Sequence, residues 1–251
     1  LVLINPNNPT GTVTPPDEIE KICQVAIEHD LIVISDEIYA RITYGNNRVL
    51  PVASIPGMRE RTITLSGFSK AYAMTGWRIG YFAAPREMIP ALSEINHAFV
   101  ISVAGVSQYA ALAALRGSQD CVDEMRRTYD ERRKVMLAGL DAMGIPYAEP
   151  QGAFYVYAKA SVTGVTATEF CERVLAEGRV MMYPGPPFVM YAMNATFFGM
   201  RAAPVGLREA WESGAYRWSL TTRRRHANDL DYAGTLIAVT EVSAGAKADG
   251  G

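Results

Sequence analysis

The stretch SGFSKAYAMTGWRIGY, residues 66–81, carries a lysine and an arginine eight positions apart, Lys70 and Arg78. The short apolar run of residues 62–65 (Thr-Ile-Thr-Leu) precedes it. Its last residues begin a second apolar run, residues 79–83 (Ile-Gly-Tyr-Phe-Ala). Short runs of β-branched and aromatic side chains bounded by glycine and serine are typical of strands. We therefore predict two strands of one sheet, joined by a polar segment that holds Lys70.

The chain before this stretch shows a strand, helix, strand pattern. Residues 1–4 and 31–34 are continuous apolar runs, which indicates strands buried on both faces. Between them Pro15 and Pro16, two acidic residues and apolar positions at helical spacing predict a helix that ends near Asp30, with Thr14 as its N-cap. The economical interpretation is an α/β fold, with a mixed or mostly parallel sheet covered by helices.

Residues 87–144 favour helices, after which strands and helices alternate again. We predict a large domain over residues 1–143, a smaller α/β domain over 144–242 and a disordered tail over 243–251. Predicted strands of the second part include residues 153–157 and 179–182, and a helix is predicted over 167–177. One face of a long helix before the boundary is predicted to comprise Val122, Met125, Tyr129, Met136, Leu140 and Met143.

Composition narrows the class of protein. The 251 residues have a formal net charge of −2, which gives no global field for nucleic acid or a membrane surface. No run reaches the roughly 20 apolar residues that span a bilayer. Three widely spaced cysteines, Cys23, Cys121 and Cys171, indicate free buried thiols in a reducing compartment, so we expect a cytoplasmic protein. The three histidines share no metal-ligand spacing, so no metal site is expected.

Four polar clusters come directly after predicted strands or beside them, where open α/β sheets bind ligands. Each cluster alone has an ordinary explanation: turn chemistry, a helix cap, or solvated surface charge. Together they offer an amide, a carboxylate with a phenol three residues later, a lysine among small and hydroxyl residues, and an arginine. The clusters are residues 5–11 (NPNNPTG), 36–39 (DEIY), 66–70 (SGFSK) and 76–80 (GWRIG).

In this order the four motifs resemble the fold-type I pyridoxal-phosphate (PLP) enzymes, and specifically class I/II aminotransferases similar to aspartate aminotransferase. The block SKAYAMTGWRIGY is the most specific of them, and the resemblance extends over residues 1–185. It implies a partial three-layer PLP-transferase large domain, a smaller C-terminal domain and a homodimer. Because the chain starts at Leu1 in a predicted buried strand, the resemblance also implies that the upstream part of the large domain is missing from it.

The resemblance implies a role for each matching residue. Lys70 would carry PLP as a Schiff base and move protons at the substrate α-carbon. Asp36 would pair with the pyridine nitrogen, and Asn8 and Tyr39 would bind the ring hydroxyl oxygen. Arg78 would bind the cofactor phosphate, with Ser69 as a weaker candidate, because the family's usual hydroxyl three residues before the lysine is replaced here by Gly67.

A second arginine of the family binds the substrate α-carboxylate. Arg217 is the predicted residue, because the alternation in residues 215–220 places it on the polar face of a half-buried strand. About 30 residues separate it from Pro184-Gly185, where the family has few, and the segment 186–213 is therefore an unusual insertion. Arg201 and Arg208 remain alternatives.

The leading hypothesis is an aminotransferase that moves an amino group between an L-amino acid and a 2-oxo acid. A PLP-dependent C–S or other β-lyase is the alternative on the same scaffold, although those relatives tend to carry histidine where this chain has Tyr39. The aminotransferase-like effector domain of a transcription regulator is another alternative. The chain could also be a truncated product without activity.

Overall fold

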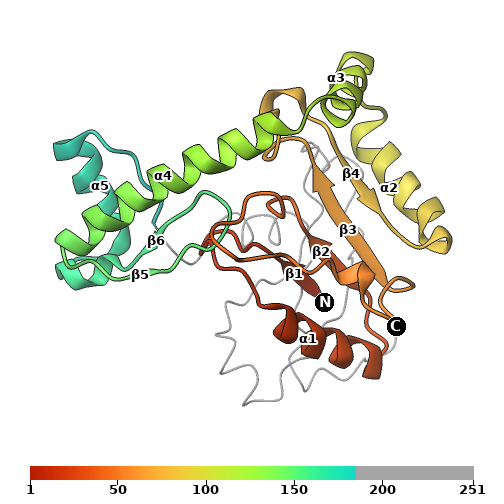
Figure 1. Ribbon diagram of the computed structural model, residues 1–251, viewed down its shortest axis with the longest axis horizontal. Helices are drawn as coiled ribbons and strands as arrows, with labels where there is room; N and C mark the ends of the chain where they lie inside the picture. Colours follow the sequence, from red (N-terminus) through yellow and green to blue (C-terminus); the bar gives the residue numbers. More distant parts are fainter. Residues whose placement is uncertain (185–251) are drawn as a thin grey trace, which may run out of the picture. The chain divides into compact units, whose positions relative to one another are not determined.

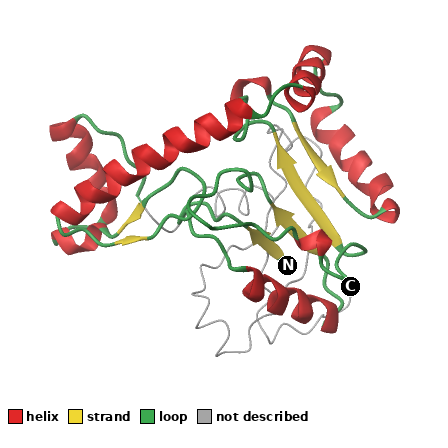
Figure 2. Cartoon of the chain, viewed as in Figure 1, coloured by secondary structure: helices red, strands yellow, loops and turns green. Residues whose placement is uncertain are grey.

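The computed structural model describes residues 1–184. Contacts between residues divide the chain into two compact units, residues 1–166 and 167–251. The first unit holds a four-stranded sheet and the helices around it (Figures 1 and 2). Of the second unit the structure describes helix α5, Ala167–Gly178, which was predicted over residues 167–177. The domain boundary after residue 143 stays a prediction.

The main sheet has the order β1-β2-β3-β4. Strands β1 (Val2–Ile4), β2 (Val33–Asp36) and β3 (Thr62–Gly67) are parallel, and β4 (Gly80–Ala83) is antiparallel to β3. The predicted mostly parallel α/β sheet is thus confirmed. Strand β2 is shifted by two residues from the predicted run 31–34. It begins at Val33 and ends at the polar Asp36.

Helix α1 (Pro16–Glu28) connects β1 to β2 and buries Ile19, Cys23 and Ala26. These side chains pack with Val33 and Met58 into one hydrophobic cluster. The N-cap is Pro15, so the predicted cap at Thr14 is wrong. The backbone N–H of Thr14 instead donates to Asn5 Oδ1 at 3.0 Å, which closes the loop after β1.

Three helices follow the sheet, and the predicted face of the longest is partly wrong. They are α2 (Ile89–Val100), α3 (Gly105–Arg116) and α4 (Asp120–Ala142). Helix α4 buries Val122 and Leu140 as predicted, but Met136 and Met143 are 55% and 63% exposed. Leu137 is buried instead of Met136. At 3.6 residues per turn Leu137 and Met136 lie on opposite sides of the line through Val122 and Leu140, and the buried face extends toward Leu137.

After α4 the chain forms a short hairpin of β5 (Tyr147–Ala148) and β6 (Tyr157–Ala158). The strand predicted over residues 153–157 is largely absent, because Ala153 has a φ of 56° and donates its N–H to the carbonyl of Ile42. Residues 179–182, also predicted as a strand, have no regular secondary structure. Short 3₁₀ turns complete the described part: η1 (Val52–Ser54), η2 (Thr75–Trp77), η3 (Arg86–Met88) and η4 (Ala160–Thr163).

All three cysteines are free, as expected, but only Cys23 is buried. Cys121, at the first turn of α4, is exposed, which corrects the expectation of three buried thiols. Within residues 1–184, none of the helices has both the length and the apolar character that crossing a bilayer requires.

Candidate active site

The predicted site residues follow the carboxyl ends of the three parallel strands. The loop after β1 begins at Asn5, whose N–H donates to the carbonyl of Asp36 at 3.1 Å. Asp36 ends β2, and the N–H of Glu37 donates to the carbonyl of Leu65 in β3 at 2.9 Å. Because parallel strands end at one edge of a sheet, three of the four polar clusters start from the same edge (Figure 1).

Asp36 presents a carboxylate without a cation. Its Oδ1 accepts a hydrogen bond from the N–H of Ile38 at 3.1 Å, and no lysine or arginine within residues 1–184 forms an ion pair with it. Burial raises the pKa of Asp36, and the Ile38 hydrogen bond offsets only part of that rise. A half-buried carboxylate of this kind is suited to a positively charged N–H from a ligand.

Glu37 differs from its neighbour, because both of its contacts are internal. Its Oε1 accepts from the hydroxyl of Ser35 at 2.9 Å and from the N–H of Val52 at 3.3 Å. Glu37 therefore joins β2 to η1. Of the two adjacent acids, Asp36 is the one left to bind a ligand.

Tyr39 is buried beside Lys70. Its phenol oxygen lies 2.6 Å from that of Tyr155, and burial together with this hydrogen bond raises the pKa of Tyr39, so that the phenol stays neutral. The Lys70 ammonium lies 5.7 Å from the centre of the Tyr39 ring and 5.5 Å from that of Phe154. These distances are within the range of cation–π attraction. Neither a hydrogen bond nor an ion pair holds Lys70 Nζ within the described residues.

The loop that carries Lys70 starts where the paired strands β3 and β4 approach each other closely. A Cβ at Gly67 would lie 2.9 Å from the Cα of Gly80 and 3.3 Å from the carbonyl oxygen of Ile79. Only glycine lets the strands approach this closely. A residue with a hydroxyl side chain would therefore not fit at position 67 without a shift of β4.

The other predicted residues occupy less constrained places. Asn8 and Ser69 are half-buried, and within residues 1–184 neither side chain forms a hydrogen bond. Arg78 is exposed, has a left-handed backbone with φ 48°, and donates to the carbonyl of Thr75 at 2.9 Å. Arg217, Arg201 and Arg208 lie outside the described residues.

Residues 150–155 form a part of the site that sequence reasoning missed. The N–H groups of Gln151 and Gly152 both donate to the carbonyl of Gly11 at 2.8 Å, and Gly152 forms a bridge with Thr43. Phe154 packs edge-on against Tyr39, with ring centres 5.3 Å apart. The segment thus fastens the loop after β1 to the turn after β2. The sequence Gly-Ala-Phe-Tyr at 152–155 was the available signal, but a core strand explained it equally well.

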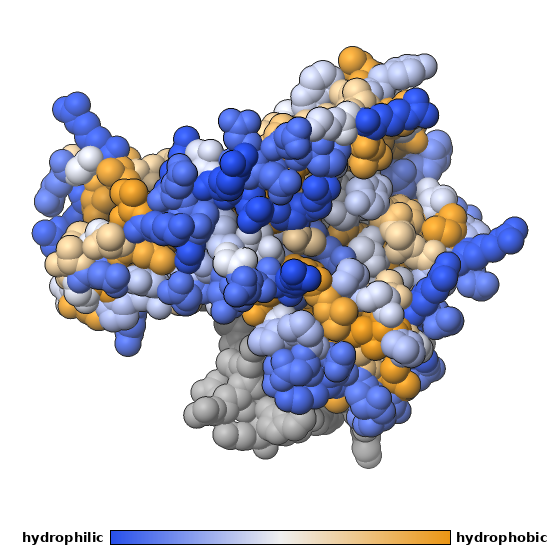
Figure 3. All heavy atoms as spheres, viewed as in Figure 1, coloured by the Kyte–Doolittle hydropathy of each residue, from blue (hydrophilic) through white to orange (hydrophobic). Residues whose placement is uncertain are grey.

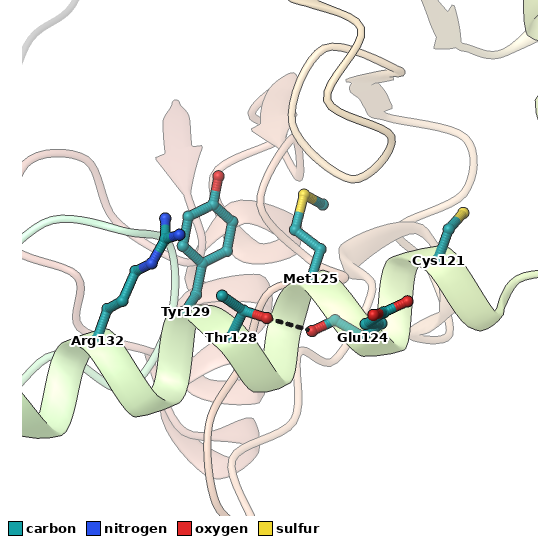
Figure 4. Close-up of a pocket in the computed structure, with 6 residues that line it drawn as sticks. All are labelled: Cys121, Glu124, Met125, Thr128, Tyr129 and Arg132. Atoms are coloured by element: carbon teal, nitrogen blue, oxygen red, sulfur yellow. Dashed lines mark hydrogen bonds between the residues drawn. The ribbon is translucent and has the colours of Figure 1, made fainter.

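A shallow cavity of about 310 Å³ opens on α4 behind this aromatic cluster. Figure 4 shows Tyr129 and Arg132 side by side on the helix, together with the hydrogen bond from the Thr128 hydroxyl to the Glu124 carbonyl, 3.1 Å long. The Tyr129 ring also packs against Phe154 at 5.4 Å. None of the predicted site residues lines this cavity.

The fold and the site define an α/β protein that places a lysine, a carboxylate and a phenol beyond the carboxyl ends of adjacent strands. Comparison with known sequences makes the assignment specific, since residues 1–198 match the family "Aminotransferase class I and II". The chain belongs to this family.

Similar proteins include an aspartate aminotransferase of Pyrococcus abyssi, 44% identical over 190 residues, and aromatic-amino-acid aminotransferase 2 of Thermococcus litoralis, 41% identical over 190 residues. Each alignment covers 75% of this chain and 49% of the relative. Among solved structures, the aromatic aminotransferase of Pyrococcus horikoshii is 43% identical with a TM-score of 0.71, over 74% of this chain and 50% of that one. The chain thus spans about half the length of the curated relatives it matches.

Proposed function

We propose that this chain provides the catalytic lysine and most of the cofactor-ring contacts of a PLP-dependent aminotransferase, which moves an amino group from an L-amino acid to a 2-oxo acid. The observation that carries the proposal is the placement of an unpaired amine at Lys70 against the buried rings of Tyr39 and Phe154, on the sheet edge that also presents Asp36. Family membership and the names of the relatives support the reaction type.

The residues present fit PLP. Asp36 has no internal cation within residues 1–184, and burial raises the pKa of its carboxyl, so a protonated pyridine nitrogen would supply the missing positive partner. The Asn8 amide is uncommitted and Tyr39 carries a neutral phenol, and both can bind the ring oxygen. Ser69 and Arg78 are the candidates for the phosphate, for which Arg78 would exchange its hydrogen bond with Thr75.

When bound, PLP supplies an electron sink that stabilises negative charge at the substrate α-carbon. Lys70 would bind the cofactor through Nζ, release it to the substrate amine, and then take and return the α-proton at the same atom. Asp36 would keep the pyridine nitrogen protonated through its charge. Tyr39, held by Tyr155, would donate to the ring oxygen, and Arg217 is proposed to bind the substrate carboxylate.

Transfer of the amino nitrogen tests this proposal against the lyase alternative. The chain is loaded with PLP and mixed in turn with ¹⁵N-labelled L-aspartate and L-phenylalanine, chosen because the relatives are named for aspartate and aromatic amino acids. We expect the label to appear in pyridoxamine phosphate and then in the amino acid formed from added 2-oxoglutarate. A parallel reaction with ¹⁵N-labelled S-methyl-L-cysteine, which has a thiolate leaving group on its β-carbon, tests the lyase alternative. Release of labelled ammonium, methanethiol and pyruvate from it, without labelled pyridoxamine phosphate, would assign the lyase reaction. PLP binding without turnover of either kind would favour the effector-domain alternative.

We also propose a homodimer that forms through α2 and α3. Helix α2 has twelve residues and none of them is buried, and α3 exposes Val106, Tyr109 and Leu115 at 67%, 77% and 58%. In the upper right of Figure 3, hydrophobic side chains in orange are visible among hydrophilic ones in blue. Helix α3 packs beside the Lys70 loop, and an apolar surface of this kind is suited to association with a second copy. The unpaired thiols support the proposed cytoplasmic location.

A further inference from the structure

Gln119 lies between α3 and α4, as the N-cap residue of α4, and its side-chain amide has four hydrogen-bond partners. Nε2 donates to the carbonyls of Ala114 and Gly117, both at 3.0 Å. Oε1 accepts from the Tyr72 hydroxyl at 2.8 Å and from Arg41 Nη1 at 3.1 Å. Two donors and two acceptor positions are all that a glutamine amide offers, so its capacity is fully used.

The partners also fix the orientation of the amide. Main-chain carbonyls can only accept and a guanidinium can only donate, so exchanging the amide oxygen and nitrogen would break at least the Arg41 bond and both carbonyl bonds. Oε1 is thereby held toward Tyr72 and Arg41 by the end of α3. The half-buried setting of Gln119 strengthens these bonds relative to those of an exposed amide.

Each of the two side chains that Gln119 binds is close to a proposed site residue. Tyr72 is two residues beyond Lys70, and its ring packs on Phe68 with centres 5.5 Å apart. Arg41 is two residues beyond Tyr39, in the turn where the N–H of Ile42 donates to the Tyr39 carbonyl at 2.8 Å. Gln119 Oε1 is thus a single acceptor atom that binds both the Lys70 turn (residues 68–74) and the Tyr39 turn (residues 37–44).

We propose that Gln119 is a positioning residue, which holds the Lys70 turn and the Tyr39 turn in a fixed relation so that Lys70 Nζ stays over the Tyr39 ring. The value of this position for catalysis rests on the proposed function, whereas the coupling of the two turns does not. Gln119 acts through two hydrogen bonds, one to Tyr72 and one to Arg41, and these two contacts are called its arms.

Hydrogen–deuterium exchange of the whole chain without cofactor tests the coupling directly. The hydrogen-bonded amides of Tyr72 and Met74 report on the Lys70 turn, and those of Ala40 and Ile42 on the Tyr39 turn. We expect exchange in both turns of Gln119→Leu to be about three- to tenfold faster, the factor expected when each turn loses one net hydrogen bond. Gln108→Leu is the matched control, because Gln108 lies on α3, is exposed, and forms one bond to the Val103 carbonyl.

Two further variants separate the arms. Tyr72→Phe should speed exchange mainly in the Lys70 turn, and Arg41→Met mainly in the Tyr39 turn. Gln119→Glu keeps the acceptor for both arms and loses the two N–H donors, so it should preserve both turns while loosening the residues around Ala114 and Gly117. If Gln119→Leu changes the two turns no more than Gln108→Leu does, the proposal is overturned.

The cofactor provides a second readout. In the chain mixed with PLP and borohydride, we expect Gln119→Leu to label Lys70 several-fold more slowly and with a shifted pH dependence, and Gln119→Glu to restore both. Labelling of Gln119→Leu with the wild-type rate and pH profile would overturn the catalytic part of the proposal. If the wild-type chain takes no label at Lys70 while Gln119→Leu still loosens both turns, the proposed function fails and the coupling stands.

Discussion

At the scale of single residues, the site is defined by which polar atoms have internal partners and which do not. Asp36 and Glu37 are adjacent carboxylates, and burial is the main cause that raises the pKa of each. Glu37 is held by Ser35 and Val52, whereas Asp36 receives one backbone N–H. The difference predicts that Asp36 costs the chain stability when no cofactor is bound.

Replacing Asp36 by asparagine should therefore stabilise the cofactor-free chain at pH 7. A carboxyl whose pKa is raised by folding favours the folded state at low pH and loses that contribution as the pH rises through the raised pKa. The gain of Asp36→Asn over wild type should be present at pH 7 and shrink toward zero near pH 3, at about which aspartate becomes neutral in both states. Urea unfolding at the two pH values measures it. Asp17→Asn, at an exposed site on α1, is the control and should bring no gain.

The Tyr39–Tyr155 hydrogen bond predicts a non-additive pair of variants. Tyr155→Phe leaves the buried Tyr39 hydroxyl without its partner and should lower the free energy of unfolding by about 1–3 kcal/mol. Tyr39→Phe combined with Tyr155→Phe removes both polar atoms and should cost less than the sum of the single changes. Denaturant unfolding of the four chains gives the coupling, and strict additivity would show that the two phenols do not interact.

At the scale of elements, the close antiparallel pairing of β3 with β4 determines where the Lys70 loop starts. Gly67 and Gly80 face each other in the register, and a Cβ at Gly67 would overlap the opposite backbone. We expect Gly67→Ala to lower the free energy of unfolding by about 1–3 kcal/mol, the usual cost of overpacking. Gly76→Ala, where a Cβ meets nothing within 4 Å, should have a much smaller effect. Equal losses in the two variants would contradict the packing argument.

The sequence predicted elements well where the cause is local. Apolar and β-branched runs located the four strands, although β1 and β4 are in part exposed and not buried on both faces as the runs indicated. It failed on the face of α4, where Met136 and Met143 are apolar yet exposed, and at Ala153, where a left-handed backbone turns the chain toward Ile42. Both outcomes depend on contacts between segments far apart in the sequence, which periodicity does not report.

The same distinction holds for the site. Asp36, Tyr39 and Lys70 could be predicted because each lies at the end of a strand or within three residues of it and matches a family motif. Phe154, Tyr155 and Gln119 could not, because their contacts join distant parts of the sequence. Tyr155 is 116 positions from Tyr39, which Phe154 also contacts, and Gln119 is 47 positions from Tyr72. Their single-residue contexts resemble ordinary core or capping positions.

At the scale of the whole molecule, the apolar surface of α2 and α3 predicts self-association. Val106→Glu and Leu115→Glu should shift the chain from dimer to monomer in sedimentation equilibrium, because a charge buried in an apolar interface loses hydration. Val135→Glu is the matched control, since Val135 is a 76% exposed apolar residue on α4 and outside this surface. A dimer that persists in the first two variants, or dissociates in the third, would place the interface elsewhere.

The central claim is that Lys70 is the residue that binds PLP. The most direct measurement is to mix the chain with PLP, reduce with borohydride, and locate the modified peptide by mass spectrometry, with Lys70→Ala and the exposed Lys21→Ala in parallel. The account predicts a visible absorption band and one stable label on Lys70, lost in Lys70→Ala and retained in Lys21→Ala. A label spread over surface lysines, or one that survives in Lys70→Ala, would contradict it.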